Sequence, residues 1–172
     1  MTGPALRLVT ESPDDTRRLG AAVAAALRLG DVVSLTGELG AGKTCLVQGA
    51  AAALGVKERV TSPSFLLRKE YDGQLRIVHI DVYRLDRLNE VEELGYEEAL
   101  DDGAVAFIEW GDAMSPLLPR DHLEIELRVG ESDDQRRIVV RPRGDDWLRR
   151  GPGLAVDLLR WAAPVNDEGG EV

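Results

Sequence analysis

The residues with the clearest chemical potential lie in the segment LTGELGAGKT, residues 35–44. This segment fits the pattern GxxxxGK(S/T) of a phosphate-binding loop at Gly37, Gly42, Lys43 and Thr44. Glycines let successive backbone N–H groups turn toward phosphate oxygens, and a helix that starts at the end of the loop adds its positive dipole end. The pattern predicts that Lys43 contacts the β- and γ-phosphates of a nucleotide and that the Thr44 hydroxyl binds Mg²⁺.

Two other interpretations of the glycine-rich segment compete with phosphate binding. A dinucleotide-binding loop has the spacing GxGxxG, which fails here because Gly40 and Gly42 are followed by Cys45 in place of a third glycine. The sequence therefore argues against NAD and FAD. A glycine-rich turn without a ligand is the remaining alternative, and the position of the motif between a strand and a helix argues against it.

The elements on either side of the loop are the ones that this motif requires. Residues 31–37 (DVVSLTG) form an apolar run typical of a buried strand, and residues 43–55 predict a helix that ends at a glycine. Upstream, residues 5–10 predict a short strand. Residues 12–30 predict a helix with Ser12 as N-cap, Pro13 in its first position and its end at Gly30.

Downstream of the loop, the patterns predict two hairpins and one further buried strand. The first hairpin joins residues 66–71 to residues 74–83 through an Asp-Gly turn, and the second joins residues 122–129 to 136–143. Residues 104–110 (AVAFIEW) predict a buried strand. Short helical turns are predicted over residues 89–103, with Asn89 and Glu92 spaced as a capping box, and a last helix over 154–163 after a break at Gly-Pro-Gly (151–153).

Together these elements predict an α/β fold of the P-loop NTPase type, with a mostly parallel central sheet, antiparallel hairpins and flanking helices. Residues 1–163 are long enough for one domain that buries roughly 70% of its unfolded surface without disulfides or a structural metal. Residues 164–172 (PVNDEGGEV) predict a disordered acidic tail.

Two carboxylates are expected at the phosphate edge of this sheet, where the parallel strands end. If the first hairpin starts near the loop, its returning strand brings Asp81 back to that edge, and Glu109 arrives there at the end of its own strand. Such acids serve to bind Mg²⁺ and to orient an attacking water. His79 faces the same side of its strand as Asp81, which leaves two interpretations open: it orients a carboxylate or water, or it is a satisfied core histidine.

Composition limits the possible partners and the compartment. The chain has 21 Lys and Arg residues against 31 Asp and Glu residues, a formal net charge of −10, which is the wrong sign for broad binding to a nucleic-acid backbone. One cysteine and two histidines without paired spacing exclude the usual zinc frameworks and indicate a reducing compartment. The N-terminus has no signal-peptide pattern and no stretch has membrane-spanning length, so we expect a soluble cytoplasmic protein with no membrane partner.

Several short motifs in fixed order closely resemble the TsaE (YjeE) family of small bacterial P-loop ATPases: GELGAGKT, SPSF, HIDVYR, LG at 94–95 and IEW. The resemblance spans about residues 5–142. It implies a subunit of the machinery that makes N6-threonylcarbamoyladenosine at position 37 of tRNAs reading ANN codons, with TsaD and TsaB as partners. In that machinery a TsaE-like protein binds and hydrolyses ATP, is weak alone, and contacts tRNA only indirectly, whereas TsaD transfers the threonylcarbamoyl group.

The resemblance also implies roles for individual residues. The ATP-binding residues would be Glu38, Leu39, Gly40, Ala41, Gly42, Lys43 and Thr44. The catalytic residues would be Asp81, Lys43 and Glu109, with Thr44 and Glu109 serving Mg²⁺. A switch-like loop that senses the γ-phosphate would contain Thr61, Ser62 and Ser64. Tyr83, Arg84 and Trp110 belong to the family pattern without an assigned role, and the segment from Arg143 is not covered by it.

Two alternative functions stay open from the sequence. A small-molecule kinase of the P-loop type is disfavoured, because the chain after Glu109 offers no arginine-rich lid to clamp a transferring phosphoryl group. A nucleotide-gated binding module without significant hydrolysis needs nearly the same residues as an ATPase. The sequence also has no obvious internal arginine finger; Arg84 is the candidate in the motif region.

Overall fold

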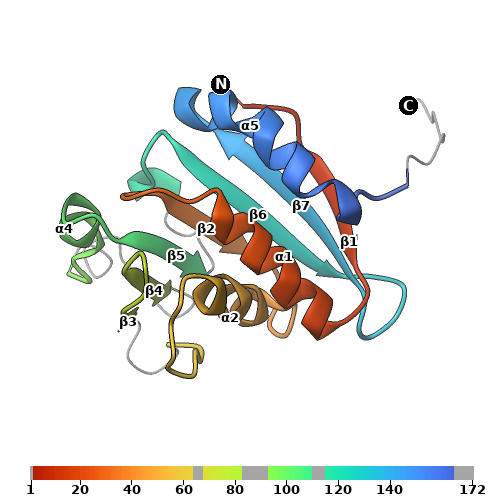
Figure 1. Ribbon diagram of the computed structural model, residues 1–172, viewed down its shortest axis with the longest axis horizontal. Helices are drawn as coiled ribbons and strands as arrows, with labels where there is room; N and C mark the ends of the chain where they lie inside the picture. Colours follow the sequence, from red (N-terminus) through yellow and green to blue (C-terminus); the bar gives the residue numbers. More distant parts are fainter. Residues whose placement is uncertain (1, 64–67, 83–92, 110–114, 165–172) are drawn as a thin grey trace.

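The computed structural model describes residues 2–63, 68–82, 93–109 and 115–164. The strands are β1 (Leu6–Thr10), β2 (Val32–Thr36), β3 (Arg68–Tyr71), β4 (Ile77–Asp81), β5 (Val105–Glu109), β6 (His122–Val129) and β7 (Arg136–Arg143). The helices are α1 (Pro13–Ala25), α2 (Lys43–Ala53), α4 (Tyr96–Asp101), α5 (Asp145–Asp157) and the short 3₁₀ helix η2 (Leu159–Trp161) (Figure 1). The predicted capping box at Asn89 and Glu92 lies outside the described residues.

The described strands form one mixed sheet in the order β1-β7-β6-β2-β5-β4-β3. The four central strands β6, β2, β5 and β4 are parallel, whereas β3 joins β4 and β7 joins both β6 and β1 in antiparallel pairs. The predicted α/β fold, with mostly parallel central strands and two antiparallel hairpins, is confirmed. The carboxyl ends of the central strands therefore meet at one edge of the sheet, which we call the phosphate edge because the glycine-rich loop follows β2 there.

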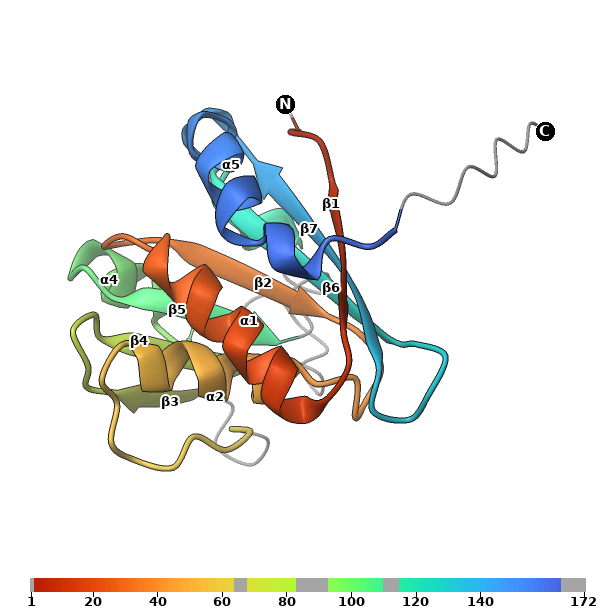
Figure 2. The ribbon, with the colours of Figure 1, turned by 45° about the vertical axis from the view of Figure 1, so that its right-hand side comes forward.

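Helices cover the two faces of the sheet unequally. α1 and α2 lie side by side on one face, and α5 lies on the same face over β7 (Figures 1 and 2). Under them is the larger hydrophobic cluster, which includes Val33 and Leu35 of β2. A smaller cluster on the opposite face joins Val32 and Ile108 to Tyr96 of α4. Because β2 is buried from both sides, the loop that follows it starts from a fixed base.

Glycines set the close approach of α1 and α2. A Cβ atom at Gly20 would lie 2.1 Å from the carbonyl oxygen of Leu46, and one at Gly49 would lie 1.8 Å from that of Arg17. The two helix backbones are therefore in direct contact at this crossing, which no larger residue would permit. This packing fixes α2, and with it the end of the glycine-rich loop, against α1.

The start of α1 is as predicted, but its end is not. The side chain of Ser12 accepts a hydrogen bond from the Asp15 N–H at 3.1 Å, and Pro13 is the first helical residue. The helix ends at Ala25 and not at Gly30. The carboxylate of Asp31 accepts the N–H of Arg28 at 2.7 Å, so a turn replaces the last predicted helical residues before β2.

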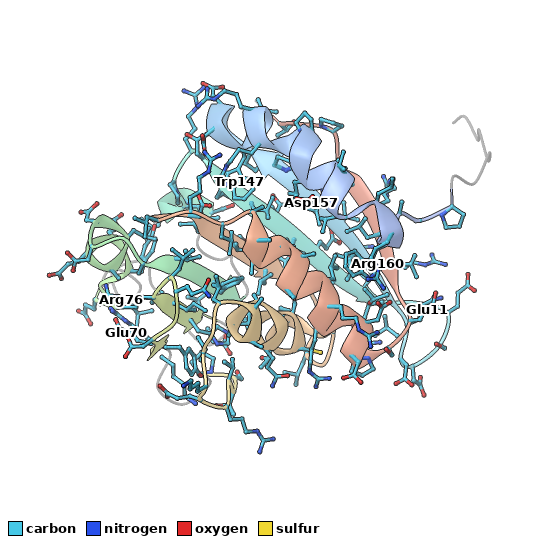
Figure 3. All side chains as sticks on the ribbon, viewed as in Figure 1. Glu11, Glu70, Arg76, Trp147, Asp157 and Arg160 are labelled. Atoms are coloured by element: carbon cyan, nitrogen blue, oxygen red, sulfur yellow. The ribbon has the colours of Figure 1, made fainter. Side chains whose placement is uncertain are left out.

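The predicted helix break at Gly-Pro-Gly is wrong, because α5 runs through Pro152 from Asp145 to Asp157. Proline removes one helical hydrogen bond, and tertiary packing offsets this loss. Trp147 is fully buried on the sheet side of α5 (Figure 3), and the guanidinium of Arg150 lies 3.6 Å above its ring. Arg150 also donates to Asp31 at 2.7 Å, which ties the helix to the start of β2.

No helix within the described ranges is long and apolar enough to cross a membrane.

Candidate active site

The loop between β2 and α2 has the backbone of a phosphate-binding loop. Gly37, Gly40 and Gly42 have φ angles of 147°, 81° and 102°, which side chains other than glycine rarely adopt. α2 begins at Lys43, and no side chain in the described parts of the chain caps its N-terminus. The first N–H groups of α2 are thus without a side-chain cap at the positive end of the helix dipole, the arrangement that binds anions.

The predicted ATP-binding residues all lie in or directly after this loop. Residues Glu38, Leu39 and Gly40 are exposed, Leu39 to 86%, whereas Ala41 is buried. Exposed side chains leave the backbone N–H groups as the part of the loop that is able to surround a phosphate. The position of the loop matches the prediction; its ligand stays a prediction.

Lys43 is 5% exposed and its Nζ donates to the carbonyl oxygens of Gly37 at 2.7 Å and Glu38 at 2.9 Å. The ammonium group therefore lies across the first half of the loop and not in open solvent. In phosphate-binding loops a lysine so placed puts a positive charge beside the phosphates.

Thr44, Glu109 and His79 form a hydrogen-bonded cluster beside the loop. The Thr44 hydroxyl donates to Oε1 of Glu109 at 2.7 Å, and Nε2 of His79 lies 2.9 Å from the same oxygen. Glu109 is 3% exposed and His79 is fully buried. The structure thus places a fully buried His79 against a carboxylate, which fits both interpretations left open by the sequence.

The surroundings of Glu109 keep its carboxyl group ionised. Burial works to raise the pKa of Glu109, but the hydrogen bond and charge of His79, the Thr44 hydroxyl and the charge of Lys43 outweigh it, so the pKa lies below its ordinary value. An ionised carboxylate next to a threonine hydroxyl is a pair of hard oxygen donors.

Asp81 stands directly opposite Glu109 in the pairing of β4 with β5. It is 7% exposed, and the Ser62 hydroxyl donates to its Oδ2 at 3.4 Å. The structure therefore brings both carboxylates to the phosphate edge, where the strand geometry predicted them. Their chemical roles stay predictions.

The start of the predicted switch-like loop lies against β3 and β4. Thr61 accepts a hydrogen bond from Lys69 of β3 through its hydroxyl, and its N–H donates to the hydroxyl of Tyr71 at 3.4 Å. Ser62 reaches Asp81, as described above. The other residues of interest in the motif region, Ser64, Tyr83, Arg84 and Trp110, lie outside the described residues.

Arg136 is a neighbour of the loop that sequence reasoning missed. Its Nε donates to the carbonyl oxygen of Ala41 at 2.9 Å and its Nη2 to that of Gly40 at 3.3 Å. Figure 2 shows why: the tip of the β6–β7 hairpin lies next to the loop that follows β2. The only sequence signal was an arginine at the first position of a predicted strand, which says nothing about its neighbour.

The donors at this site fit Mg²⁺ that is bound together with a nucleotide. Thr44 and Glu109 supply a hydroxyl and an ionised carboxylate 2.7 Å apart. Within the described ranges no group of three or more His, Cys, Asp or Glu side chains is arranged to hold a metal alone. Mg²⁺ in phosphoryl-transfer sites usually takes one or two protein oxygens and completes its shell with phosphates and water.

Comparisons with known proteins agree with this geometry. The family model described as "Threonylcarbamoyl adenosine biosynthesis protein TsaE" matches residues 10–138. The tRNA threonylcarbamoyladenosine biosynthesis protein TsaE of Treponema pallidum is 43% identical over 135 residues, which covers 78% of this chain and 99% of that protein. The protein of the same name from Bacillus subtilis is 38% identical over 141 residues, which covers 81% of this chain and 87% of that protein.

A solved structure extends the match to most of the chain. The crystal structure of Bacillus subtilis YdiB superposes with a TM-score of 0.72 at 32% identity, covering 93% of this chain and 97% of that one. The phosphate-binding loop, the two carboxylates at the phosphate edge and these similarities lead to one assignment: the chain belongs to the TsaE family.

Proposed function

We propose that this protein is the ATP-binding and ATP-hydrolysing subunit of the cytoplasmic machinery that makes N6-threonylcarbamoyladenosine at position 37 of tRNA. One observation carries the proposal: Lys43, Thr44, Asp81 and Glu109 converge on the end of a glycine-rich loop in a chain of the TsaE family. These are the groups that phosphoryl transfer from a nucleoside triphosphate requires.

In this proposal the loop binds the phosphates through its backbone. The N–H groups of the loop and of the first turn of α2 donate to phosphate oxygens, and Lys43 exchanges its present acceptors, the carbonyl groups of Gly37 and Glu38, for the β- and γ-phosphates. The chemical gain is large because a carbonyl carries only a partial negative charge, whereas a phosphate oxygen makes a charge-assisted bond.

Thr44 and Glu109 would hold Mg²⁺. The bound ion supplies charge neutralisation at the β- and γ-phosphate oxygens. To serve as a ligand, the Thr44 hydroxyl would either give up its hydrogen bond to Glu109 or keep it while its own oxygen binds the metal. His79 keeps its contact with the carboxylate at 2.9 Å and so holds it in place.

Asp81 is left as the group that orients the attacking water. Hydrolysis forms a bond between the water oxygen and the γ-phosphorus and breaks the bond to the oxygen that bridges the β- and γ-phosphates, so that ADP leaves with the electron pair. Asp81 accepts a hydrogen bond from the water as it attacks, and the proton that the water loses passes to an oxygen of the released phosphate. Ser62, which donates to Asp81, connects the switch-like loop to this position.

Partner proteins would complete the site. P-loop hydrolysis commonly gains a factor of about 10³–10⁵ from a cationic group supplied in trans. We propose TsaD and TsaB as the partners, with tRNA contacted only through them. The net charge of −10 fits such an indirect relation to tRNA.

The test is phosphate release from Mg-ATP by the protein alone and then with TsaD, TsaB and tRNA. We expect slow release alone, stimulation by the partners, and loss of both rates in Lys43→Ala. Lys57→Ala is the matched control, because Lys57 is exposed and follows the far end of α2. Turnover that survives in Lys43→Ala contradicts the assignment of the loop. ATP binding without hydrolysis, even with partners, supports a nucleotide-gated module instead.

A further inference from the structure

Arg136 occupies a fixed position beside the phosphate-binding loop. It is the first residue of β7, where it pairs with Val129 of β6 on one side and with Thr10 of β1 on the other. A strand held on both sides gives its first residue little freedom, so the guanidinium starts from a rigid base. The side chain belongs to the helix-covered face of the sheet, the same face as Ile138 and Val140, and not to the solvated face.

The guanidinium joins two segments that are far apart in sequence. Toward the phosphate-binding loop it donates to the carbonyl oxygens of Ala41 at 2.9 Å and Gly40 at 3.3 Å. Toward its own hairpin, Nη1 donates to the carbonyl oxygens of Asp133 at 2.6 Å and Gln135 at 2.8 Å. The rigid fork of an arginine is suited to such a bridge, because its donors point in fixed directions within one plane.

The bond to Ala41 also determines where the next N–H group points. A trans peptide is planar, with its C=O and N–H directed to opposite sides, and the described chain contains no cis peptide. Arg136 holds the C=O of Ala41 on the side of the loop that faces the β6–β7 hairpin, which we call the outer side, so the N–H of Gly42 points away from that hairpin. The preceding turn is closed by the Ala41 N–H, which donates to the carbonyl of Glu38 at 3.0 Å.

Among the residues that the structure describes, no carboxylate pairs with the charge that Arg136 brings to the loop. All four of its hydrogen bonds go to backbone carbonyl groups, and none of the ion pairs within the described residues includes it. Its neighbour Arg137 differs in this respect, since that residue lies on the solvated face and pairs with Glu131 at 3.0 Å. A full positive charge at the outer wall of the loop favours the approach of a polyanion.

We propose that Arg136 is a positioning residue for nucleoside polyphosphates: it clamps the outer carbonyls of the phosphate-binding loop so that the Gly42 N–H stays directed at the phosphates. The clamp ties nucleotide binding to the β6–β7 hairpin. This inference rests on the proposed function, because the ligand of the loop is the phosphate chain of ATP. It adds a residue outside the motifs that carry the family resemblance.

The first measurement is the affinity for Mg-ADP by calorimetry. We expect Arg136→Gln to raise Kd roughly 10- to 100-fold, the range for hydrogen bonds made by a charged group, and Arg136→Lys to raise it less, because lysine keeps the charge but not the fork. Arg137→Gln is the matched control and should leave Kd unchanged. In turnover assays with partners, KM for ATP should rise in Arg136→Gln while kcat changes little, since the chemical groups stay in place.

The second measurement needs no nucleotide: hydrogen exchange of the backbone amides over residues 35–44, with thermal unfolding as a check on the fold. We expect faster exchange in Arg136→Gln at an unchanged melting temperature. The proposal is overturned if Arg136→Gln folds, binds Mg-ADP with the wild-type Kd and exchanges the amides of residues 35–44 at the wild-type rate. Should Arg136→Gln fail to fold, Arg136→Lys decides in the same way. A wild-type protein that does not bind Mg-ADP refutes the proposed function, whereas the exchange arm still tests the clamp.

Discussion

The two hairpins of the sheet approach the phosphate edge from opposite directions. In the β3–β4 hairpin the turn at Asp72 and Gly73 lies at the far edge, and the returning strand ends at the site with Asp81. In the β6–β7 hairpin the turn itself lies at the phosphate edge, and the returning strand begins there with Arg136. The same local structure therefore delivers a carboxylate from a strand end in one case and a guanidinium from a strand start in the other.

This difference separates the expected roles of the two hairpins. Asp81 is paired with Glu109 on a buried parallel strand, next to the groups that would act on the γ-phosphate. Within the described residues the guanidinium of Arg136 donates its hydrogen bonds to backbone carbonyls, two of which belong to the loop that would hold the phosphates. A substitution of Asp81 in the first hairpin should therefore slow the chemical step, whereas a substitution of Arg136 in the second should weaken nucleotide binding.

Among substitutions in the two hairpins, the largest effect is expected from Asp81→Asn, which keeps the size of the side chain but removes its charge. Loss of a group that orients the reacting water lowers kcat by roughly 10²- to 10⁴-fold, and the Kd for Mg-ADP should change little. The measurement is partner-stimulated phosphate release together with calorimetry. Asp72→Asn, in the exposed turn of the same hairpin, is the control. An Asp81→Asn protein with normal turnover removes Asp81 from the chemistry.

The second prediction concerns the turn at the far edge. A Cβ atom at Gly73 would lie 2.6 Å from the carbonyl oxygen of Leu54, so this turn packs directly on the end of α2. Gly73→Ala should lower the free energy of unfolding by about 1–3 kcal/mol, the usual cost of overpacking against backbone. At temperatures where it stays folded, its Kd for Mg-ADP should match the wild type.

Gly153→Ala provides the matched control, because in the described part of the chain no heavy atom beyond its own neighbours and helix backbone lies within 4 Å of the added Cβ in α5. It should leave stability unchanged or raise it by up to about 1 kcal/mol, the helix-propensity difference. Urea unfolding measures both variants. A Gly73→Ala protein as stable as the wild type would show that the turn and α2 separate without cost.

Local sequence patterns predicted both hairpins. They also predicted that Asp81 lies at the phosphate edge, but they did not predict that Arg136 contacts the loop there. Asp-Gly and the following strand were enough to return Asp81 to the phosphate edge, because the chain has to reverse at that turn. The position of Arg136 depends on β6 pairing with β2 in parallel, and the contact with Ala41 spans 95 residues, so no local pattern encodes it. The helix break predicted at Pro152 failed for a related reason: burial of Trp147 and the ion pair of Arg150 with Asp31 are tertiary interactions.

A smaller effect is expected when the second hairpin is loosened without touching Arg136. Gln135 holds the turn, since its Oε1 accepts the N–H of Glu131 at 2.7 Å and its Nε2 donates to Glu11 at 3.1 Å, near the end of β1 (Figure 3). Gln135→Ala should raise the Kd for Mg-ADP by about 2- to 10-fold, because one or two exposed hydrogen bonds are lost. The check is calorimetry beside Arg136→Gln. An effect larger than that of Arg136→Gln would mean that the turn itself, and not the guanidinium, holds the loop.

The smallest effect is a change in the pH dependence of stability at Glu109. Its folded-state pKa lies below the ordinary value of 4.5, so the stability it contributes is present above that value and is lost as pH falls through the lower, folded-state pKa. Glu109→Gln should therefore flatten the decline of the unfolding free energy below about pH 4.5. Glu126 in β6 is the comparison: burial works to raise its pKa, but hydrogen bonds from Arg128 and Arg141 outweigh it and the pKa is lowered. Because the side chain of Glu126 is 19% exposed against 5% for Glu109, solvent screens its ion pairs more, and Glu126→Gln should flatten the curve less. If the unfolding free energy declines with the same slope below pH 4.5 in both variants, the prediction is contradicted. Glu109, buried beside His79 and Lys43, would then be coupled to its charged neighbours no more strongly than Glu126.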